Sequence, residues 1–367
     1  MNKKKLCGLT AEDIFRIIEP GGFNQTHAVL IANALYKRKI ADFSQITKIS
    51  KGLKSWMTDN SVPGIYEPIT SELSSDKTVK YLFRTEEEKL FETVFIPDLK
   101  RNTVCVSTQS GCRMGCPFCV TAKYGFHGDL SAGEIVNQII SLPEADNITN
   151  VVFMGMGEPM DNLEEVLKAC EIITAQWGLS ISPANVTVST VGITPGVESF
   201  LDRSECNLTV SLYSPFEDER KTVVKVENRY PVREIIEIMK NYPLRKKRRL
   251  SMAYVMIKNI NDSDRHLEGL KKLLHDSKIR VNLLPYHPGK NDENTSSSDD
   301  RMQYFKHNLV VSGISASIRR SRGTDISAAC GLLASDRLKD FEDFTARQEI
   351  LKKRYDVIDI STNLLTC

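Results

Sequence analysis

The strongest constraint on the fold is a regular alternation of strand-like and helix-like segments from Thr103 onward. Short runs of β-branched and apolar residues recur, and the stretches between them carry apolar residues at helical spacing. The predicted strands are residues 104–107, 151–154, 186–190, 207–212, 250–256, 280–285 and 315–319. Because parallel neighbours need crossover helices, the alternation predicts an α/β fold with a parallel sheet, either open or closed into a barrel.

The segments before residue 101 follow other patterns. Residues 1–60 have helical spacing, with Thr10 and Asp13 as an expected capping pair, and predict a small helical accessory domain that binds RNA. Residues 61–100 contain two strand-like runs around a charged turn and predict a β-hairpin linker. The remaining divisions are a catalytic domain at residues 101–335 and a helical tail at residues 336–367.

Charge and hydropathy exclude several classes of protein. The chain has 49 lysine and arginine residues against 47 acidic residues, a formal net charge of +2, so any surface for a polyanion must be local. The longest apolar runs, such as residues 151–156, are far shorter than the roughly 20 residues that cross a bilayer. The basic start at residues 3–5 precedes no signal-peptide core. We expect a cytoplasmic protein with no membrane partner.

Three of the nine cysteines are concentrated in one loop. Cys112, Cys116 and Cys119 follow the first predicted strand, and Phe118 precedes the last of them. Reducing cytosol disfavours disulfides, so such a group is typical of a metal or redox site. Three thiolates can hold a four-iron cluster and leave one iron open. The alternative is a structural zinc knuckle, which needs a fourth ligand that no nearby Cys or His pair supplies.

A short glycine turn follows the next predicted strand. Gly155, Gly157 and Glu158 lie in it, at a carboxyl end where β/α proteins build ligand sites. Taken alone, it is most often an ordinary turn between a strand and a helix. Together the cysteine loop and this turn resemble the radical S-adenosylmethionine (SAM) superfamily. The resemblance implies a partial β/α barrel with a [4Fe-4S] cluster on the three cysteines. It also implies a turn that binds the amino group of SAM through Gly157 and Glu158.

Further motifs resemble one family of that superfamily, the bacterial dual-specificity methyltransferases of adenine carbon 2 in ribosomal and transfer RNA. The motifs keep the family's order over nearly the whole chain, at residues 105–112, 155–159, 189–192, 211–213 and 325–331. The resemblance implies methylation in the peptidyl-transferase centre of 23S ribosomal RNA and next to the anticodon of transfer RNA. It also implies two molecules of SAM per turnover.

The resemblance assigns the catalytic steps to three residues. Carbon 2 of adenine lies between two ring nitrogens and is electron-poor, so it cannot attack the methyl group of SAM directly. Cys330 is implied to take a methyl group from one SAM, and a radical from a second SAM turns it into a methylene radical that adds to the base. Cys105 then closes a transient disulfide with Cys330. Either Glu92 or Cys105 takes the carbon-2 proton.

Without the resemblance, these residues have plainer interpretations. Cys330 and Cys105 would be small buried residues, which is the usual place of a free cysteine. Glu92 would be an exposed strand residue. The other cysteines match no motif and are expected to be structural: Cys7, Cys170, Cys206 and Cys367.

Further contacts with SAM are implied at the ends of later strands, at Ser189, Ser211, Leu212, Tyr213 and His287. Tyr213 stands where histidine is common in the family, and His287 stands where asparagine is common. A backbone contact survives the first change, and histidine retains a donor or acceptor after the second. The segment at residues 221–228 also departs from the family's usual Met-Pro-Ile-Asn version, and Leu332 replaces a common glutamine.

Two basic segments are candidates for contact with RNA phosphates, residues 245–249 and 319–322. The first is as easily a solvated surface run. The second leads directly toward Cys330, where the target base must arrive. The implied partners are the two RNA substrates and a reducing electron donor such as flavodoxin or ferredoxin, and the expected oligomeric state is a monomer.

Two alternatives stay open from the sequence. Relatives of the same family methylate carbon 8 of ribosomal adenine, but they tend to replace the proline matching Pro159, so its presence favours carbon 2. A chain of a different class would be a non-catalytic RNA-binding or metal-binding module of ribosome assembly. The presence of Glu92, Cys105 and Cys330 favours the enzyme.

Overall fold

The computed structural model describes residues 3–99, 101–244, 247–289 and 292–334, so the predicted tail at residues 336–367 lies outside the described residues. Seven strands in it form a parallel array: β6 (Thr103–Cys105), β9 (Asn150–Phe153), β10 (Val186–Thr190), β11 (Asn207–Ser211), β12 (Leu250–Met256), β13 (Arg280–Pro285) and β14 (Ala316–Ile318). Each new strand pairs in parallel beside the previous one. A strand order that follows the chain without a reversal is that of a β/α barrel. The barrel is open here, because β14 is an edge strand. The predicted partial barrel is confirmed.

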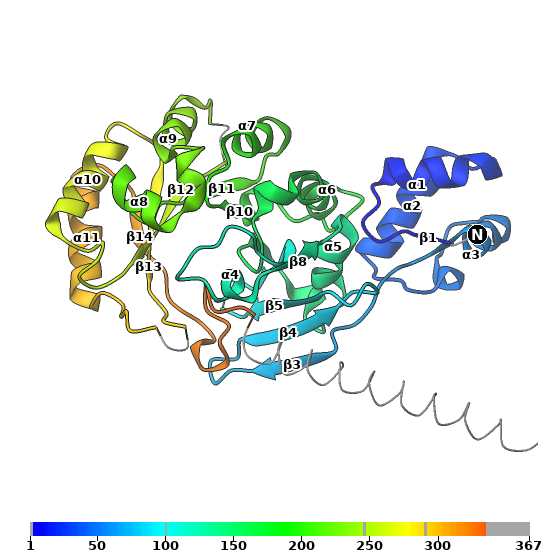
Figure 1. Cartoon of the computed structure of the whole chain (residues 1–367). Coiled ribbons are helices and arrows are strands. Elements are labelled where there is room, and N and C mark those ends of the chain that lie inside the picture. The colour runs from blue at the N-terminus through cyan, green and yellow to red at the C-terminus, as the bar shows by residue number, and fades with distance from the viewer. Residues whose placement is uncertain (1–2, 100, 245–246, 290–291, 335–367) are drawn as a thin grey trace, which may run out of the picture.

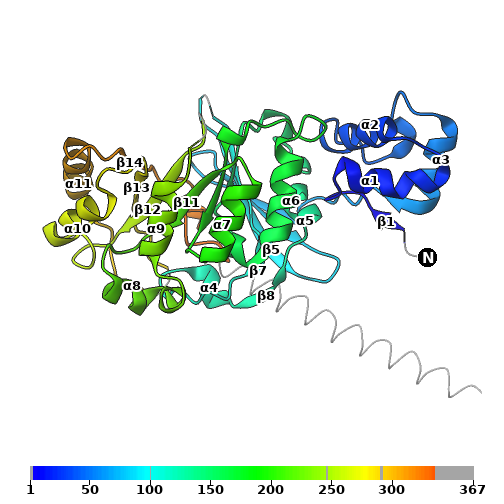
Figure 2. The ribbon, with the colours of Figure 1, turned by 90° about the horizontal axis from the view of Figure 1, so that it is seen from above.

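Helices connect successive parallel strands and lie along the outer side of the sheet (Figures 1 and 2). They are α5 (Ala132–Ile140), α6 (Leu163–Thr174), α7 (Thr194–Arg203), α8 (Glu217–Val223), α9 (Val232–Asn241), α10 (Asp264–Leu274) and α11 (Asp299–Val311). Ser131 and Glu134 form a capping box at the start of α5. Asn162 precedes α6 but does not cap it, since its amide donates to the backbone oxygens of Thr108 and Leu130.

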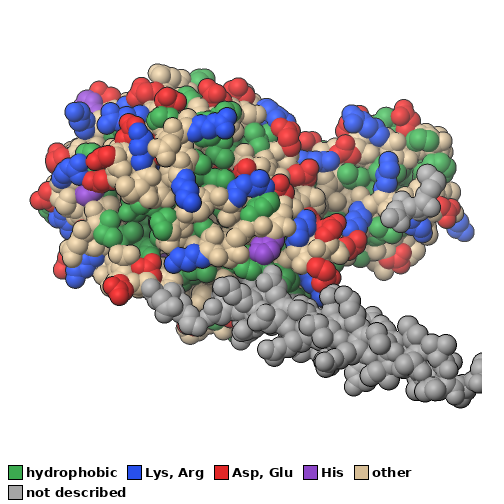
Figure 3. Space-filling model, in the orientation of Figure 1, with side chains coloured by type: hydrophobic (Ala, Val, Ile, Leu, Met, Phe, Trp, Pro, Cys, Tyr) green, Lys and Arg blue, Asp and Glu red, His purple; other side chains and the backbone are tan. Residues whose placement is uncertain are grey.

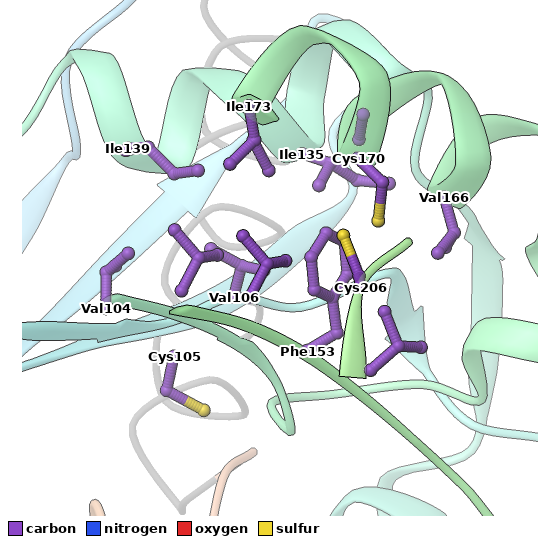
Figure 4. Packing of buried hydrophobic residues seen from close by; sticks show 14 of the residues in the cluster. Val104, Cys105, Val106, Ile135, Ile139, Phe153, Val166, Cys170, Ile173 and Cys206 are labelled. Atoms are coloured by element: carbon purple, nitrogen blue, oxygen red, sulfur yellow. The ribbon is translucent and has the colours of Figure 1, made fainter. Parts of the chain in front are cut away.

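The core fills the space between this sheet and its helices (Figure 4). Val104 and Phe153 of two neighbouring strands pack there against Ile135 of α5 and Ile173 of α6. Three cysteines without a motif are also buried, which fits their structural interpretation: Cys7, Cys170 and Cys206.

An antiparallel extension continues the sheet beyond β6. It consists of β5 (Leu90–Ile96), β4 (Val79–Arg84) and β3 (Thr70–Leu73), in that order outward. The predicted hairpin forms as β4 and β5, and β5 pairs with β6, so the hairpin is part of the ten-stranded sheet rather than a free connection between two bodies.

The helices before this extension lie at one end of the molecule (Figure 1). They are α1 (Ala11–Ile18), α2 (Gln25–Tyr36) and α3 (Lys51–Asn60), with the short parallel pair β1 (Lys4–Lys5) and β2 (Ser61–Val62) beside them. Thr10 and Asp13 form the expected capping box at α1. No helix in the described part of the chain is long and apolar enough to cross a membrane.

One small element was absent from the sequence prediction. After β6 the chain forms an antiparallel ribbon of β7 (Gln109–Gly111) and β8 (Phe126–Asp129), and the short helix α4 (Val120–Tyr124) lies between them in the chain. The strands are too short for periodicity to reveal them.

Candidate active site

The three clustered cysteines lie in the connection between β7 and α4. Cys112 follows β7 and donates its backbone N–H to the oxygen of Gly125, at 2.7 Å. Cys119 precedes α4, and its N–H donates to the oxygen of Cys116, at 3.1 Å. Backbone hydrogen bonds thus fix the loop at both ends and present the three side chains together.

Burial changes the acid–base chemistry of these thiols. Cys116 is buried, whereas Cys112 and Cys119 are half-buried. Burial raises the pKa of Cys112 and of Cys116 to about 12, and a charge on Cys119 would raise both further. Thiols with such pKa values are protonated at neutral pH, so a bound metal must displace their protons.

The donor set fits an iron–sulfur cluster better than a zinc ion. A structural zinc ion needs four donors gathered around one centre. A cluster of four irons instead takes three thiolates on three different irons and leaves the fourth iron open, so the three cysteines of this loop are a sufficient donor set for it. Cys112, Cys116 and Cys119 would therefore hold such a cluster.

The glycine turn after β9 packs against the segment that leads to the cysteine loop. A Cβ on Gly157 would lie 2.7 Å from the backbone nitrogen of Gln109, and its φ of +102° is one that side chains rarely adopt. A Cβ on Gly155 would lie 2.7 Å from the hydroxyl oxygen of Ser107. Glycine is therefore required at both positions for this close approach.

Glu158 ties that turn to the next strand. Its buried carboxylate accepts N–H groups of Met160, at 3.0 Å, and of Val191 after β10, at 2.8 Å. Burial raises the pKa of Glu158 to about 7. A carboxylate has about four acceptor positions, so capacity remains for an amino group of a ligand.

The polar positions expected to contact SAM lie along the carboxyl ends of β10 and β11. Ser189 and Ser211 are half-buried there, and Leu212 is fully buried and donates its N–H to the oxygen of Ala253, at 2.9 Å. Parallel pairing of β10 with β11 brings these ends to the same edge as the glycine turn.

A buried arginine that the sequence did not reveal holds these strand ends. Arg220 of α8 is fully buried and donates to the backbone oxygens of Leu212 and Ser211, at 3.0 Å each, and of Val191, at 2.5 Å. Glu227, also fully buried, completes an ion pair with it. The pair links α8 to the edge that carries the expected SAM contacts.

Tyr213 brings the strand edge and the cysteine loop together. Its ring lies parallel to that of Phe118, with 5.8 Å between centroids and 1° between planes. Its φ is +61°, a left-handed conformation that is uncommon outside glycine, and its backbone oxygen accepts from the amide of Asn261, at 2.8 Å. Burial raises the pKa of Tyr213, so the phenol is neutral at physiological pH.

His287 connects the edge to the basic segment before Cys330. Its Nε2 lies 2.5 Å from the hydroxyl oxygen of Ser321. Burial lowers the pKa of His287, which favours the neutral imidazole. The neutral ring has one donor and one acceptor nitrogen, so one nitrogen remains for a ligand.

The loop that carries Cys330 is anchored on two sides. Gly331 accepts the N–H of Val120 in α4, at 2.8 Å, which places the loop against the cysteine connection. Ala334 donates its N–H to the carboxylate of Glu92 in β5, also at 2.8 Å. Cys330 therefore lies between the cluster loop and the antiparallel extension.

The same loop is also held by the turn between β3 and β4. The carboxylate of Asp325 accepts from the hydroxyl of Ser74, at 2.6 Å, and from the N–H of Ser75, at 3.0 Å. Gly323 donates its N–H to Asp76, at 3.0 Å. The antiparallel extension is thus the support on which the Cys330 loop rests.

The strand register puts Cys105 and Glu92 on one face of the sheet. Val94 is paired with Cys105, and Glu92 lies two residues before Val94, so all three side chains share a face. Cys105 points away from the side occupied by Val104 (Figure 4). Burial raises the pKa of the Cys105 thiol, and a charge on Cys330 would raise it further. The two cysteines are therefore close enough to interact electrostatically.

Cys330 itself is accessible to solvent, although protein atoms surround its thiol closely. Burial raises the pKa of Cys330, while the positive charge of Arg319 opposes this shift. Arg319 is exposed and begins the basic segment that the sequence predicted to contact RNA. A thiol that is both accessible and next to a cation suits a group-transfer role.

The other predicted basic segment is only partly suited to contact RNA. Residues 245–246 lie outside the described residues, and Arg248 is buried, where it donates to the backbone oxygen of Leu201 and the hydroxyl of Tyr242, at 2.8 and 3.0 Å. Arg248 is therefore structural. Basic and acidic side chains are interspersed over the visible face (Figure 3), in keeping with the small net charge.

Comparison with known proteins identifies the family. Residues 106–270 match the Radical SAM superfamily. A protein of Parabacteroides distasonis named "Probable dual-specificity RNA methyltransferase RlmN" is 42% identical over 91% of this chain and 98% of its own length. The "Dual-specificity RNA methyltransferase RlmN" of Syntrophotalea carbinolica is 37% identical over 89% of each chain. The chain belongs to the RlmN family.

A solved structure supports the same conclusion at the level of the fold. A radical SAM methyltransferase from Sphaerobacter thermophilus has a TM-score of 0.82 and 34% identity, and the match covers 90% of this chain and 99% of that one. The protein is thus a radical SAM methyltransferase of the RlmN family. Membership implies a [4Fe-4S] cluster and SAM as cofactors, with two molecules of SAM per turnover.

Within this RlmN-family protein, the residues named from the sequence gather at one edge of the sheet and on one adjoining face. The contacts that support them were not foreseen. Arg220 carried no signal, because an arginine in a helix as rich in charged residues as α8 is expected to be exposed. Lys80, whose Nζ lies 3.3 Å from the carboxylate of Glu92, could have been suspected, because it interrupts an apolar strand.

Proposed function

We propose that this chain methylates carbon 2 of adenine in 23S ribosomal RNA, at the peptidyl-transferase centre, and in transfer RNA next to the anticodon. One observation carries the proposal. The accessible Cys330 lies in a loop bonded to both α4 and Glu92, near Cys105. A carrier thiol, a second thiol and a carboxylate are thus within one site.

The cluster and SAM would supply a carbon-centred radical when they are bound. Cys112, Cys116 and Cys119 would hold the iron, because they share one fixed loop. Gly157 and Glu158 would receive the amino group of SAM, and Ser189, Ser211, Leu212, Tyr213 and His287 would line the rest of its site. Tyr213 and Phe118 already join the two halves of that site by their ring contact.

Cys330 would carry the methyl group to the base. A methylene radical on its sulfur can add to an electron-poor ring carbon, whereas an ordinary methyl donor cannot react there. The target adenine must leave its stack to reach this thiol, at an expected cost of a few kcal/mol. Exposed cations such as Arg319 and Arg320 would offset part of that cost by binding phosphates.

Glu92 would take the proton from carbon 2 of the resulting adduct. Burial raises the pKa of Cys105, so its thiolate is costly to form, and the thiol is a poor candidate for that base. The carboxylate of Glu92 is bonded to the N–H of Ala334, four residues after Cys330, which holds it beside the loop. Cys105 would then release the product by forming a transient disulfide with Cys330.

We further infer the domain roles and partners. Residues 1–60 would form an accessory RNA-binding domain, residues 61–100 a connecting hairpin, residues 101–335 the catalytic domain, and residues 336–367 a tail. The enzyme would act as a cytoplasmic monomer. A small reductant such as flavodoxin or ferredoxin would supply electrons.

Nucleoside mass spectrometry tests the proposal. We expect a strain that lacks the gene to lose 2-methyladenosine from both RNAs, and the purified enzyme to restore it. Unchanged 2-methyladenosine in both RNAs would reject the assignment, and 8-methyladenosine as the product would identify the carbon-8 alternative. Failure to methylate Cys330 in the presence of SAM would instead favour a non-catalytic module.

A further inference from the structure

The face of the antiparallel extension that carries Glu92 also carries a second buried charge. Lys80 in β4 is only 4% exposed, and the register places it on the same face as Glu92, because Leu82 pairs with Glu92 and lies two residues from Lys80. Glu72 in β3 is paired directly with Lys80. Three charged side chains therefore follow one another across three adjacent strands.

The distances join these groups into a chain. The Nζ of Lys80 lies 3.3 Å from Glu92 Oε1 and 3.9 Å from Glu72 Oε1. The side chains of Lys80 and Glu92 are 4% and 3% exposed, whereas that of Glu72 is 19% exposed. The chain thus runs from the buried carboxylate beside the Cys330 loop toward the solvent.

Such a row of buried charges has a cost that packing alone does not explain. An ion pair removed from water gains little net stability, and apolar residues of similar size often serve a fold as well. A base in a buried site, however, must be ionised before it can accept a proton. An ammonium group beside it favours that ionised state.

We propose that Lys80 is a positioning residue for proton removal, which holds the Glu92 carboxylate in an ion pair beside the Cys330 loop and connects it to Glu72 as the route of the proton to solvent. The inference rests on the proposed role of Glu92. When Glu92 takes the carbon-2 proton, it becomes neutral. It returns that proton to Lys80 as Lys80 gives one of its own protons to Glu72. Lys80 stays an ammonium, Glu92 is again a carboxylate, and Glu72 releases the proton to water.

The test measures the lifetime of the covalent enzyme–RNA adduct. Because the adduct is released only after it has lost the carbon-2 proton, slow proton removal lengthens this lifetime. Purified holoenzymes carrying Lys80→Met, Lys80→Arg, Glu72→Gln or Glu92→Gln are given SAM, a reductant and a substrate RNA. Adduct is followed on denaturing gels. Methylated Cys330 and 5′-deoxyadenosine are measured in the same samples, because both form before the proton leaves.

We expect Lys80→Met to lengthen the adduct lifetime by about tenfold to a hundredfold. The upper value is about the smallest rate enhancement that positioned proton-transfer groups usually provide. The two earlier products should form at the parent rate. Lys80→Arg should lengthen the lifetime less than Lys80→Met does, because arginine keeps a cation beside Glu92 but cannot give a proton to Glu72. Glu72→Gln should also lengthen it by a smaller factor than Lys80→Met. A normal lifetime in Lys80→Met would overturn the inference, and a normal lifetime in Glu72→Gln would overturn the route through Glu72.

Two controls separate this inference from folding defects and from the proposed function. Arg84→Met changes another cation on the same strand and face, which pairs with Glu88 near the solvent at 3.1 Å, and it should leave the lifetime unchanged. If Lys80→Met fails to fold, Lys80→Gln replaces it, since glutamine keeps a donor without the charge. If the adduct is long-lived in Glu92→Gln but has a normal lifetime in Lys80→Met, only the proposed role of Lys80 is refuted. A normal lifetime in Glu92→Gln refutes the role of Glu92 itself.

Discussion

The two halves of the sheet contribute different parts of the chemistry. The parallel half, β6 with β9 to β14, collects polar and glycine positions at its carboxyl edge, where a cofactor would bind. The antiparallel half, β3 to β5, has no such edge, yet it holds the Cys330 loop and presents Glu92 and Lys80 from its face. The comparison teaches that, under the proposed function, the residues for radical generation and those for base modification would lie on separate supports that meet at the Cys330 loop.

Removal of a cluster ligand should have the largest effect, because it disables the parallel half. Cys116→Ala takes away the most buried of the three thiols. We expect loss of bound iron and of SAM cleavage, and with them all RNA methylation. Iron and sulfide content after anaerobic reconstitution and release of 5′-deoxyadenosine are the measurements. Full iron content with normal SAM cleavage would contradict the assigned ligand.

Changes at Cys330 and Cys105 should distinguish the contributions of the two halves of the sheet. Cys330→Ala should abolish RNA methylation while iron content stays at the parent level, because the cluster loop is intact. Cys105→Ala should instead form a covalent adduct with RNA that is not released. Intact-protein and nucleoside mass spectrometry distinguish the two. Normal methylation by the Cys330 variant would refute the carrier role.

Loss of the buried arginine should weaken the edge of the parallel half. Arg220→Met leaves Glu227 buried without its partner, which typically costs about 3–5 kcal/mol of unfolding free energy. Changing Glu227→Leu in addition should recover much of that loss. Denaturant unfolding of both variants measures this, and equal stability of the single and double variants would show that the pair is not coupled.

The pH dependence of stability should carry a smaller signal from Glu158. Burial raises its folded-state pKa to about 7 from an ordinary 4.5, so the folded protein binds the proton more tightly than the unfolded chain does. This contribution is fully present below pH 4.5 and is lost as the pH rises through about 7, by about 3 kcal/mol at 1.36 kcal/mol per unit. The free energy of unfolding should therefore decrease as the pH rises through this window. The slope of this decrease should be smaller in Glu158→Gln. An unchanged slope in that variant would contradict the assignment to Glu158.

Much of the parallel half could be predicted from the sequence. β10, β12 and β13 begin and end at the predicted residues, because short apolar runs between helical segments are a local signal. The cysteine loop and the glycine turn could also be predicted from the sequence, since their chemistry depends on the spacing of a few neighbouring residues. The capping box at Thr10 could be predicted for the same reason, since it depends on two residues three positions apart.

The antiparallel half needed the tertiary structure. The sequence predicted its hairpin, but the third strand β3 and the pairing of β5 with β6 depend on residues that lie apart in the chain. Only that pairing puts Cys105, Glu92 and Lys80 on one face, because a shift of register by one residue would turn every side chain over. The sequence by itself thus determined which residues can bind a cluster and SAM. The packing of distant segments decided which carboxylate and which thiol lie beside the Cys330 loop, and which ammonium group pairs with that carboxylate.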